Sequence, residues 1–341
     1  MTSQNNSRTV GIIGAGAWGT VFAQVLADAG SQVILFTPEP DVVDSINGYH
    51  TSRYVPAVTL PAQISATGNL QECVEGAKRI VVAVPSHAVE SALSPLFGQI
   101  GDREVLSLVK GVRGGEFMST IISRTLGLAE HQLSVLSGPN LAIEIAARQP
   151  ANTVIANPDL ERAKGWADVC ANAYFRPYLS TDVRGCEIGG IVKNVIALAV
   201  GASAGMGLGT NTRSALITRG LAEMTRLGMA MGAQQETFLG LAGIGDLVTT
   251  CSSELSRNFT FGSNLGKGLS VSQAKVASKG VAEGAQCCQD VLDLANSLGV
   301  EMPITEAVVD VIHHGHSARQ MGERLLGRPR KMDGVSLQIV D

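Results

Sequence analysis

A lysine in a long apolar stretch is the first residue of this chain that could do chemistry. Lys193 is the only charged residue between Glu187 and Arg213, and the apolar residues around it recur at helical spacing. An ammonium group that loses its hydration in apolar surroundings holds its proton less tightly than in water, which suits a proton donor or acceptor near neutral pH. The alternative is that the aliphatic stem of Lys193 carries the charge out to solvent.

Two further polar groups follow Lys193 along the chain. Asp246 stands in the apolar, glycine-rich run 240–247, where a carboxylate needs a cationic partner if it stays ionised. We expect that partner to be Lys193. A hydroxyl, a guanidinium and an amide then follow in succession, a set that suits a phosphate dianion: Ser256, Arg257 and Asn258. The alternative for this triplet is a helix cap followed by a surface arginine.

A glycine motif near the N-terminus predicts a nucleotide site. A short strand at 9–13 leads directly into a G-x-G-x-x-G, and a helix and a second strand follow it. We expect Gly14 to make the tight turn, Gly16 to let the backbone approach a pyrophosphate, and Gly19 to let helix and strand pack closely. The helix N-terminus would hold the phosphates. The alternative is a strand–helix–strand turn without a ligand.

The choice between NAD and NADP stays open in the sequence. An NAD site usually carries an acidic residue at the end of the second strand. That point reads Thr37-Pro38-Glu39, so the carboxylate is displaced along the chain. No arginine or lysine is expected beside it to bind a 2′-phosphate.

These residues need a sheet and a helical bundle to position them. Strands are predicted at 9–13, 32–36, 79–84, 104–109, 133–136, 152–156 and 175–179, with a looser stretch at 41–70. From Glu187 onward the pattern is almost wholly helical. The sequence therefore predicts an α/β fold in which an N-terminal Rossmann-like dinucleotide-binding domain (1–184) is followed by an all-α C-terminal domain (185–341). Lys110 would face the crevice at the carboxyl ends of the strands, and the turn before a helix at 141–147 could serve a ligand oxygen.

Composition and charge exclude several classes of protein. At 341 residues the chain is long enough for two cores, and a net charge of −4 without a long basic run argues against a nucleic-acid partner. The polar N-terminus lacks a signal-peptide pattern, and no run approaches the ~18 apolar residues of a membrane span. We therefore expect a cytoplasmic protein without stable membrane insertion.

The cysteines and histidines give no metal prediction. The six cysteines form no C-x-x-C pair, so buried reduced thiols are expected. The histidine tract at 313–316 has no companion cysteine or carboxylate at ligand spacing. No metal site is expected.

Several short motifs run in order along nearly the whole chain. They are Gly14-Ala15-Gly16-Ala17-Trp18-Gly19-Thr20, Val109-Lys110-Gly111, Ser137-Gly138-Pro139, Cys186-Glu187-Ile188-Gly189-Gly190 with Lys193-Asn194, Asn211-Thr212-Arg213 through Thr218-Arg219-Gly220, Gly243-Ile244-Gly245-Asp246-Leu247, Leu255-Ser256-Arg257-Asn258 and Val281-Ala282-Glu283-Gly284. In this order they resemble the bacterial-type NAD(P)-dependent glycerol-3-phosphate dehydrogenases far more specifically than the glycine fingerprint alone.

The resemblance implies a reaction and a set of roles. The reaction is reversible hydride transfer between NAD(P)H and C2 of dihydroxyacetone phosphate, giving sn-glycerol 3-phosphate for phospholipid synthesis. Lys193 would donate the proton in reduction and accept it in oxidation. The implied substrate-binding residues are Lys110, Gly138, Asn140, Lys193, Asp246, Ser256, Arg257 and Asn258. The implied cofactor-binding residues include five from the glycine motif, and the full set is Gly14, Gly16, Ala17, Trp18, Gly19, Lys110, Ala142, Arg257, Val281 and Glu283.

Two positions depart from the family's pattern. Asn140 stands where Ser or Thr is more common, although an amide can also donate and accept hydrogen bonds. Pro38 stands where His or Arg is frequent beside the adenosine ribose, which argues against a strong NADP preference. A homodimer is usual in the family and is expected here on that ground alone.

Two other functions fit parts of the pattern. A two-domain reductase of the hydroxyacid or ketopantoate type would share the cofactor domain and the lysine but would take a carboxylate substrate. A nicotinamide-binding regulator without turnover would not need Lys193. The combination of Lys193, Asp246 and Arg257 favours an enzyme.

Overall fold

The computed structural model describes residues 8–129, 131–278 and 282–329. The chain divides into two compact units, Met1–Lys110 with Glu116–Val183, and Gly111–Gly115 with Arg184–Asp341. The segment 111–115, which holds the short strand β6 (Val112–Arg113), is part of the second unit, where the Gly114 amide donates to Asp290 Oδ1 at 3.1 Å. The sequence pattern gave no sign of this excursion because so short a segment has no periodicity to detect.

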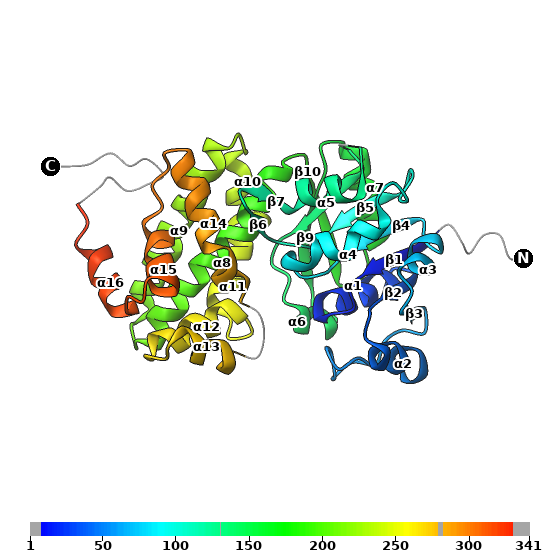
Figure 1. The fold of residues 1–341 in the computed structure, drawn as a ribbon, viewed down its shortest axis with the longest axis horizontal. Helices are drawn as coiled ribbons and strands as arrows, with labels where there is room; N and C mark the ends of the chain where they lie inside the picture. Colours follow the sequence, from blue (N-terminus) through cyan, green and yellow to red (C-terminus); the bar gives the residue numbers. More distant parts are fainter. Residues whose placement is uncertain (1–7, 130, 279–281, 330–341) are drawn as a thin grey trace, which may run out of the picture. The chain divides into compact units, whose positions relative to one another are not determined.

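The first unit is built on an eight-stranded sheet (Figure 1). Its order is β10-β9-β8-β5-β4-β1-β2-β3, and β8 and β9 are antiparallel whereas the other neighbours are parallel. The strands are β1 (Thr9–Ile13), β2 (Gln32–Phe36), β3 (Ile64–Thr67), β4 (Arg79–Val82), β5 (Glu104–Ser107), β8 (Leu133–Ser137), β9 (Ala151–Ala156) and β10 (Phe175–Ser180). Because β1 pairs with both β2 and β4, the order reverses at β1, as in dinucleotide-binding sheets. The predicted Rossmann-like fold is confirmed.

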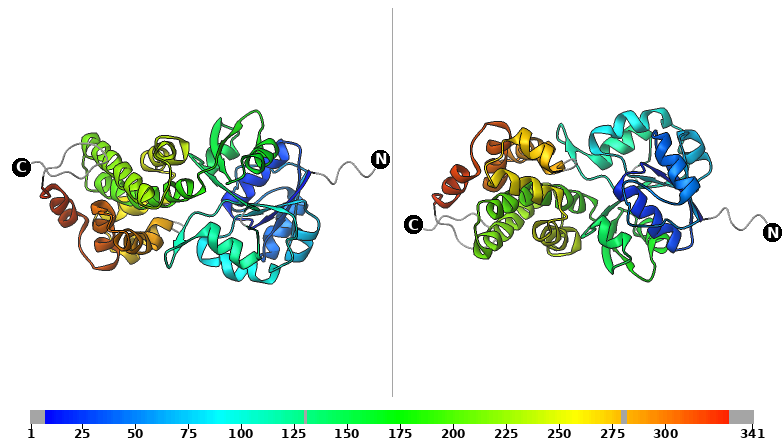
Figure 2. Two further views of the ribbon diagram at one scale, coloured as in Figure 1. Left: turned by 90° about the horizontal axis from the view of Figure 1, so that it is seen from above. Right: turned by 90° about the horizontal axis from the view of Figure 1, so that it is seen from below.

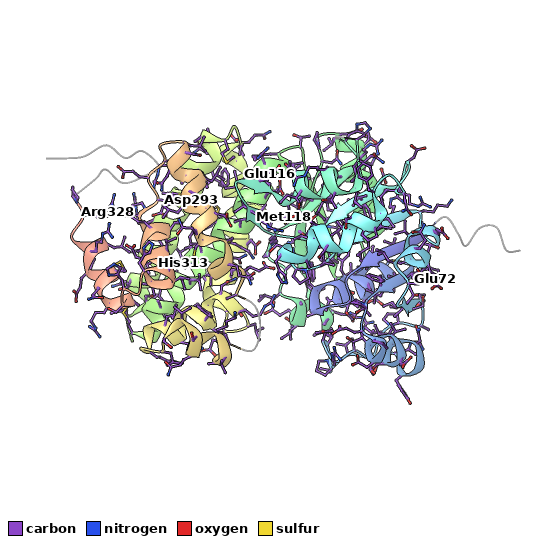
Figure 3. The ribbon with its side chains drawn as sticks, in the orientation of Figure 1. Glu72, Glu116, Met118, Asp293, His313 and Arg328 are labelled. Carbon is purple, nitrogen blue, oxygen red and sulfur yellow. The ribbon has the colours of Figure 1, made fainter. Side chains whose placement is uncertain are left out.

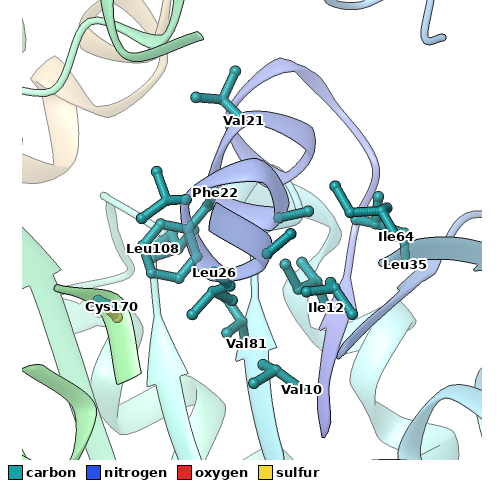
Figure 4. Close-up of a cluster of buried hydrophobic side chains, with 14 of the residues drawn as sticks. Val10, Ile12, Val21, Phe22, Leu26, Leu35, Ile64, Val81, Leu108 and Cys170 are labelled. Carbon is teal, nitrogen blue, oxygen red and sulfur yellow. The ribbon is translucent and has the colours of Figure 1, made fainter. Parts of the chain in front are cut away.

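Helices cover both faces of this sheet (Figure 2), so successive strand residues alternate between two cores. Ile12 belongs to a core that it shares with Phe22 and Leu26 of α1 (Ala17–Asp28) (Figure 4). The next residue, Ile13, lies in a second core with Ile122 of α5 (Met118–Leu126). A strand buried on both faces reads as a continuous apolar run, which is why these strands could be predicted.

The helices of the first unit connect these strands. They are α1 (Ala17–Asp28), α2 (Pro40–Tyr49), α3 (Leu70–Glu75), α4 (Val89–Leu93), α5 (Met118–Leu126), α6 (Ala142–Ala146) and α7 (Leu160–Cys170), with 3₁₀ turns η2 (Ser86–Ala88) and η3 (Ser94–Leu96) and the short strand β7 (Glu116–Phe117). The expectation of a loose stretch at 41–70 is wrong, because it contains most of α2 and all of β3. An edge strand such as β3 is short and carries polar residues, so its pattern is weak.

In the described residues of the second unit, the regular elements are helices apart from β6. Its elements are α8 (Val183–Gly205), α9 (Thr210–Ala230), α10 (Gln235–Leu239), the one-turn π-helix η4 (Leu241–Gly245), α11 (Asp246–Ser252), α12 (Arg257–Gly266), α13 (Val271–Ala277), α14 (Glu283–Ser297), α15 (Pro303–His313) and α16 (Ala318–Leu326). Helix α8 is long and apolar enough to cross a membrane by length and composition alone, but 78% of its most apolar window is buried in this unit. It is the central helix of a packed bundle, and the predicted all-α domain is confirmed.

Two helices of this bundle pack backbone against backbone. A Cβ on Gly201 of α8 would lie 2.1 Å from Phe259 O, and a Cβ on Gly262 of α12 would lie 2.1 Å from Leu198 O. No larger residue fits at either position without moving a helix. This close approach fixes α12 against the C-terminal half of α8.

Candidate active site

Three glycines shape the turn from β1 into α1. Gly14 has φ +115°, and a Cβ there would lie 2.8 Å from the backbone of Ala83. A Cβ on Gly19 would lie 2.0 Å from Gly14 O, so the helix could not pack on the strand as it does. A Cβ on Gly16, in contrast, would meet no atom within 4 Å. Gly14 and Gly19 therefore serve the fold, whereas Gly16 leaves open space in front of the helix.

This space fits the phosphates of a dinucleotide. Gly16 is the N-cap of α1 and supplies no side chain to the helix end. Ala17 is exposed and begins the helix, and the half-buried Trp18 ring packs against Phe22 at a centroid distance of 5.8 Å. Uncapped backbone N–H groups and the positive end of the helix dipole favour an anion at this point.

A basic residue does lie near the end of β2, so the expectation that none would is wrong. Arg53 pairs with both Glu39 and Asp41, and the Tyr54 hydroxyl donates to Glu39 at 2.9 Å. Arg53 follows Glu39 by 14 positions, and the intervening α2 folds back to bring them together. A carboxylate and a guanidinium thus both lie where this fold binds the adenosine ribose.

Polar residues also follow β5 and β8. Lys110 is half-buried just beyond the end of β5. After β8, Gly138 has φ +136°, and Asn140 Nδ2 donates to Gly138 O at 3.1 Å and to Thr153 Oγ1 at 2.9 Å. Among the described residues, the buried Asn140 Oδ1 has no hydrogen-bond partner. It is an acceptor that a ligand hydroxyl could satisfy. Ala142 begins α6, directly after this turn.

Lys193 lies in the middle of α8 and is only 8% exposed. Its Nζ donates to Asp246 Oδ1 at 2.5 Å and to Thr250 Oγ1 at 2.9 Å. The predicted pairing of Lys193 with Asp246 is confirmed, and the alternative that its charge reaches solvent is wrong. A buried ammonium held by a carboxylate and a hydroxyl has a fixed orientation, as a proton donor requires.

The partners of Lys193 come from one turn of α11. Asp246 is 1% exposed and begins this helix directly after η4. Thr250 stands one turn later, and its Oγ1 donates to Asp246 O at 2.7 Å while accepting from Lys193. Thr250 was not predicted as a site residue. Its i,i+4 spacing from Asp246 is the signal that could have found it.

A glycine contact brings η4 close to α8. A Cβ on Gly189 would lie 2.2 Å from Ala242 O, in the π-helix just before Asp246. Single π turns are frequent at functional sites. The contact places Asp246 within reach of Lys193, which is four residues after Gly189 on the same helix.

An amide pair joins three helices beside Lys193. Asn258 Nδ2 donates to Asn194 Oδ1 at 3.0 Å, and Asn258 Oδ1 accepts from the Gly284 amide at 2.9 Å. Asn194 in turn donates to Gly190 O at 3.3 Å. Asn258 therefore holds α8, α12 and the start of α14 together. Asn194 was also not predicted as a site residue, because one asparagine in a helix carries no local signal.

The N-terminus of α12 combines a cap with an exposed cation. Ser256 Oγ accepts from the Phe259 amide at 3.3 Å, so the helix-cap alternative holds for this side chain. A hydroxyl that accepts one bond keeps its own hydrogen to donate. Arg257 is exposed at the first helical position. Glu283 begins α14, whereas Val281 lies outside the described residues.

Cys251 directly follows Thr250 on α11 and is buried near Lys193 and Asp246. All six cysteines are free and buried. Cys288 Sγ lies 3.5 Å from His313 Nε2, and His314 pairs with Asp310. The described residues contain no group of three or more His, Cys, Asp or Glu side chains that could hold a metal ion.

Two family models match consecutive parts of the chain. The model of the NAD-dependent glycerol-3-phosphate dehydrogenase N-terminus matches residues 9–163, and that of the C-terminus matches residues 182–323. The chain belongs to the NAD-dependent glycerol-3-phosphate dehydrogenase family. Its NAD(P)-binding, oxidoreductase character follows from this membership.

Relatives and solved structures agree with this membership. A glycerol-3-phosphate dehydrogenase [NAD(P)+] of Streptomyces griseus subsp. griseus is 48% identical over 324 residues, covering 94% of this chain and 96% of the relative. The crystal structure of glycerol-3-phosphate dehydrogenase from Coxiella burnetii has a TM-score of 0.89 at 36% identity and covers 94% of this chain and 99% of that one. A ketopantoate reductase from Ralstonia eutropha (18% identity, TM-score 0.59, 93% and 99% covered) shares the fold alone.

Proposed function

We propose that this chain catalyses the reversible reduction of dihydroxyacetone phosphate to sn-glycerol 3-phosphate with NADH or NADPH. The observation that carries the proposal is the buried Lys193 ammonium, held by Asp246 and Thr250 in a member of this family. A desolvated cation is costly to maintain, so its presence calls for a chemical role.

Lys193 acts as the general acid in this proposal. The bound nicotinamide supplies the hydride. As the hydride adds to C2, the carbonyl π electrons move to oxygen, and Lys193 Nζ transfers a proton to that oxygen to complete the hydroxyl. In the reverse direction the neutral amine takes the hydroxyl proton as the hydride leaves C2. A fixed cation beside a developing alkoxide lowers the barrier most where water is excluded.

Asp246 and Thr250 act as positioning residues. Each binds the ammonium directly, so the group cannot rotate away from the carbonyl oxygen. Asp246 also offsets part of the cost of burying the charge. Both effects reduce the reorganisation needed at the moment of proton transfer.

The phosphate of the substrate is assigned to the start of α12. Arg257 supplies a guanidinium, Ser256 a hydroxyl hydrogen, and the helix end a positive dipole. Asn258 holds this helix end against α8, and its second Nδ2 hydrogen is assigned to the substrate. Lys110, Gly138 and Asn140 complete the proposed substrate residues.

The cofactor residues follow the glycine turn and the family's motifs. Gly14, Gly16, Ala17, Trp18 and Gly19 are assigned to the dinucleotide around its phosphates. The remaining assigned contacts are Lys110, Ala142, Arg257, Val281 and Glu283. The ion pair between Glu39 and Arg53 offers a group for a ribose hydroxyl and a group for a 2′-phosphate, so use of both cofactors is proposed.

The test is a steady-state assay with NADH and NADPH in parallel. Dihydroxyacetone phosphate should support turnover with a kcat/KM at least about 10³-fold higher than that of any 2-keto acid, including ketopantoate. The reverse ranking would favour a ketopantoate-type reductase. No turnover with any substrate, together with tight NADH binding, would favour a nicotinamide-binding regulator.

We also propose that the protein is a cytoplasmic homodimer. Six free, buried thiols suit a reducing compartment, and a dimer is usual in the family. Light scattering at micromolar concentration should give twice the mass of one 35.5 kDa chain. A mass equal to one chain would contradict the dimer.

A further inference from the structure

A pocket within the helical unit is lined by none of the residues assigned to the proposed reaction, although α8 contributes to both. It has a volume of about 700 Å³ and is lined by α8, α9, α15, α16 and the residues that follow α16. Figure 3 labels Arg328, a lining residue that follows α16. Ligand pockets in proteins typically hold about 300–1,000 Å³. The volume is therefore that of a small-molecule site.

The walls of this pocket are mainly aliphatic. They include Leu198, Leu216, Val308, Val311, Ile312 and Leu325. Leu208 and Leu326 also line it and are 42% and 89% exposed, so apolar surface at the pocket remains open to solvent. An alkyl chain would remove that surface from water.

Arginines gather at the same pocket. Arg219, Arg226, Arg319 and Arg328 line it, against two acidic residues, Glu223 and Glu323. Arg219 and Arg226 lie seven positions apart on α9 and so share one helix face. Burial lowers the pKa of Arg226 from its ordinary value, and the positive charges of Arg219 and Arg328 add to this effect while Glu223 and Glu301 oppose it.

The buried acid in this pocket is already satisfied by the protein. Glu223 Oε1 accepts from the Ile304 amide at 2.6 Å, and Oε2 accepts from the Thr305 amide and hydroxyl at 3.2 Å. It caps the N-terminus of α15 and does not require a cationic ligand. Arg328 pairs with Glu301 at 3.1 Å, and Arg226 donates to Glu301 O at 2.9 Å. With this pair counted, the arginines of the lining still outnumber its acidic residues, so the pocket offers a positive charge to a ligand.

From the apolar walls and the arginine cluster we infer that this pocket binds a fatty acid, a single alkyl chain with a carboxylate head. The chain would lie along the aliphatic walls, and the carboxylate would bind Arg219 and its neighbours. Charge complementarity selects this occupant, because a guanidinium group can bind a carboxylate through two parallel hydrogen bonds. The inference does not depend on the proposed reaction.

The test is isothermal titration calorimetry of the full chain with octanoate, decanoate and dodecanoate below their micellar concentrations. The Kd should tighten about fourfold for each added methylene. Dodecyltrimethylammonium, which has the same chain and the opposite charge, should bind at least about tenfold more weakly than dodecanoate.

Two pairs of variants locate the site. Arg219→Gln should weaken dodecanoate binding about tenfold, whereas Arg324→Gln, on α16 but outside the lining, should leave it unchanged. Ala215→Trp, at an exposed lining position of α9, should abolish binding, whereas Ala230→Trp, exposed on the same helix outside the pocket, should not. Circular dichroism of each variant checks that it folds.

Several outcomes would overturn the inference. Absence of binding by the wild type would do so, as would equal binding by Ala215→Trp. Binding that begins only when residues 330–341 are removed would assign the pocket to the chain's own C-terminal segment. If the wild type binds no dodecanoate and Ala215→Trp halves the mass in light scattering, a second copy of the chain covers the pocket instead.

Discussion

The glycine turn of the first unit and the Lys193 group of the second are both chemically distinctive, but they are built in opposite ways. The turn uses six consecutive residues, and the groups that we propose for binding are its backbone amides. The Lys193 group uses side chains up to 57 positions apart, held by close packing of α8 against η4 and α12. The first should therefore be sensitive to added volume, and the second to lost charge.

Lys193→Ala should give the largest effect on turnover. Removing both the proton donor and the cation should lower kcat at least about 10³-fold. NADH affinity, measured by fluorescence titration, should stay within about twofold because the glycine turn is untouched. If the variant kept more than a tenth of the wild-type kcat, the proposed role of Lys193 as proton donor would be wrong.

Asp246→Ala should give the largest effect on stability. It leaves a buried ammonium without its carboxylate, which typically costs about 3–5 kcal/mol in the free energy of unfolding. The matched control is Lys193→Met with Asp246→Leu, which removes both charges and should recover most of that loss in urea unfolding. If Asp246→Ala were as stable as the wild type, the ion pair between Lys193 and Asp246 would contribute nothing to the free energy of unfolding.

Glu223 is a second buried acid in the same unit, and its pKa makes stability depend on pH. Burial raises the pKa of Glu223 to about 7, because backbone amides of α15 offset the desolvation only in part. The folded state therefore holds a proton that the unfolded state releases above its ordinary pKa of 4.5. Stability should fall by about 2–3 kcal/mol as the pH rises from 5 to 8.

Glu223→Gln should remove this slope, since glutamine mimics the protonated acid at every pH. Urea unfolding at pH 5, 6.5 and 8 measures the difference between the two proteins. Parallel curves for the wild type and Glu223→Gln would contradict the assignment of the slope to this group.

Gly16→Ala and Gly19→Ala separate cofactor binding from folding in the first unit. The added methyl on Gly16 meets no protein atom, so the thermal midpoint should change by less than about 2 °C. It should nevertheless weaken NADH binding about 10–100-fold by filling the space for the pyrophosphate. Gly19→Ala should lower the midpoint as well, because its methyl clashes with the Gly14 carbonyl. Unchanged NADH affinity in Gly16→Ala would remove the dinucleotide from this turn.

Thr250→Val should give the smallest effect. It keeps the shape of the side chain but removes one hydrogen bond to the ammonium, so kcat should fall about tenfold. The pH profile of kcat should shift with it, and Thr250→Ser should restore both. A loss of stability without any change in the pH profile would make Thr250 purely structural.

The same contrast explains what could be predicted from the sequence. The strands buried on both faces and the glycine turn carry local patterns, so both were predicted, and the pairing of Lys193 with Asp246 followed from the cost of a buried charge. Thr250 and Asn194 were missed because their roles depend on which helices pack together. Arg53 was missed because α2 folds it back onto Glu39. The edge strand β3 was missed because its four residues carry too little apolar signal.

The most direct test of the account is chemical rescue of Lys193→Ala by small primary amines during reduction of dihydroxyacetone phosphate. If the ammonium of residue 193 donates the proton, added methylammonium and ethylammonium should restore turnover in proportion to their concentration, and tetramethylammonium, which has no proton to give, should not. Equal stimulation by tetramethylammonium, or no rescue by any amine in a variant that still binds NADH and substrate, would contradict proton donation by Lys193.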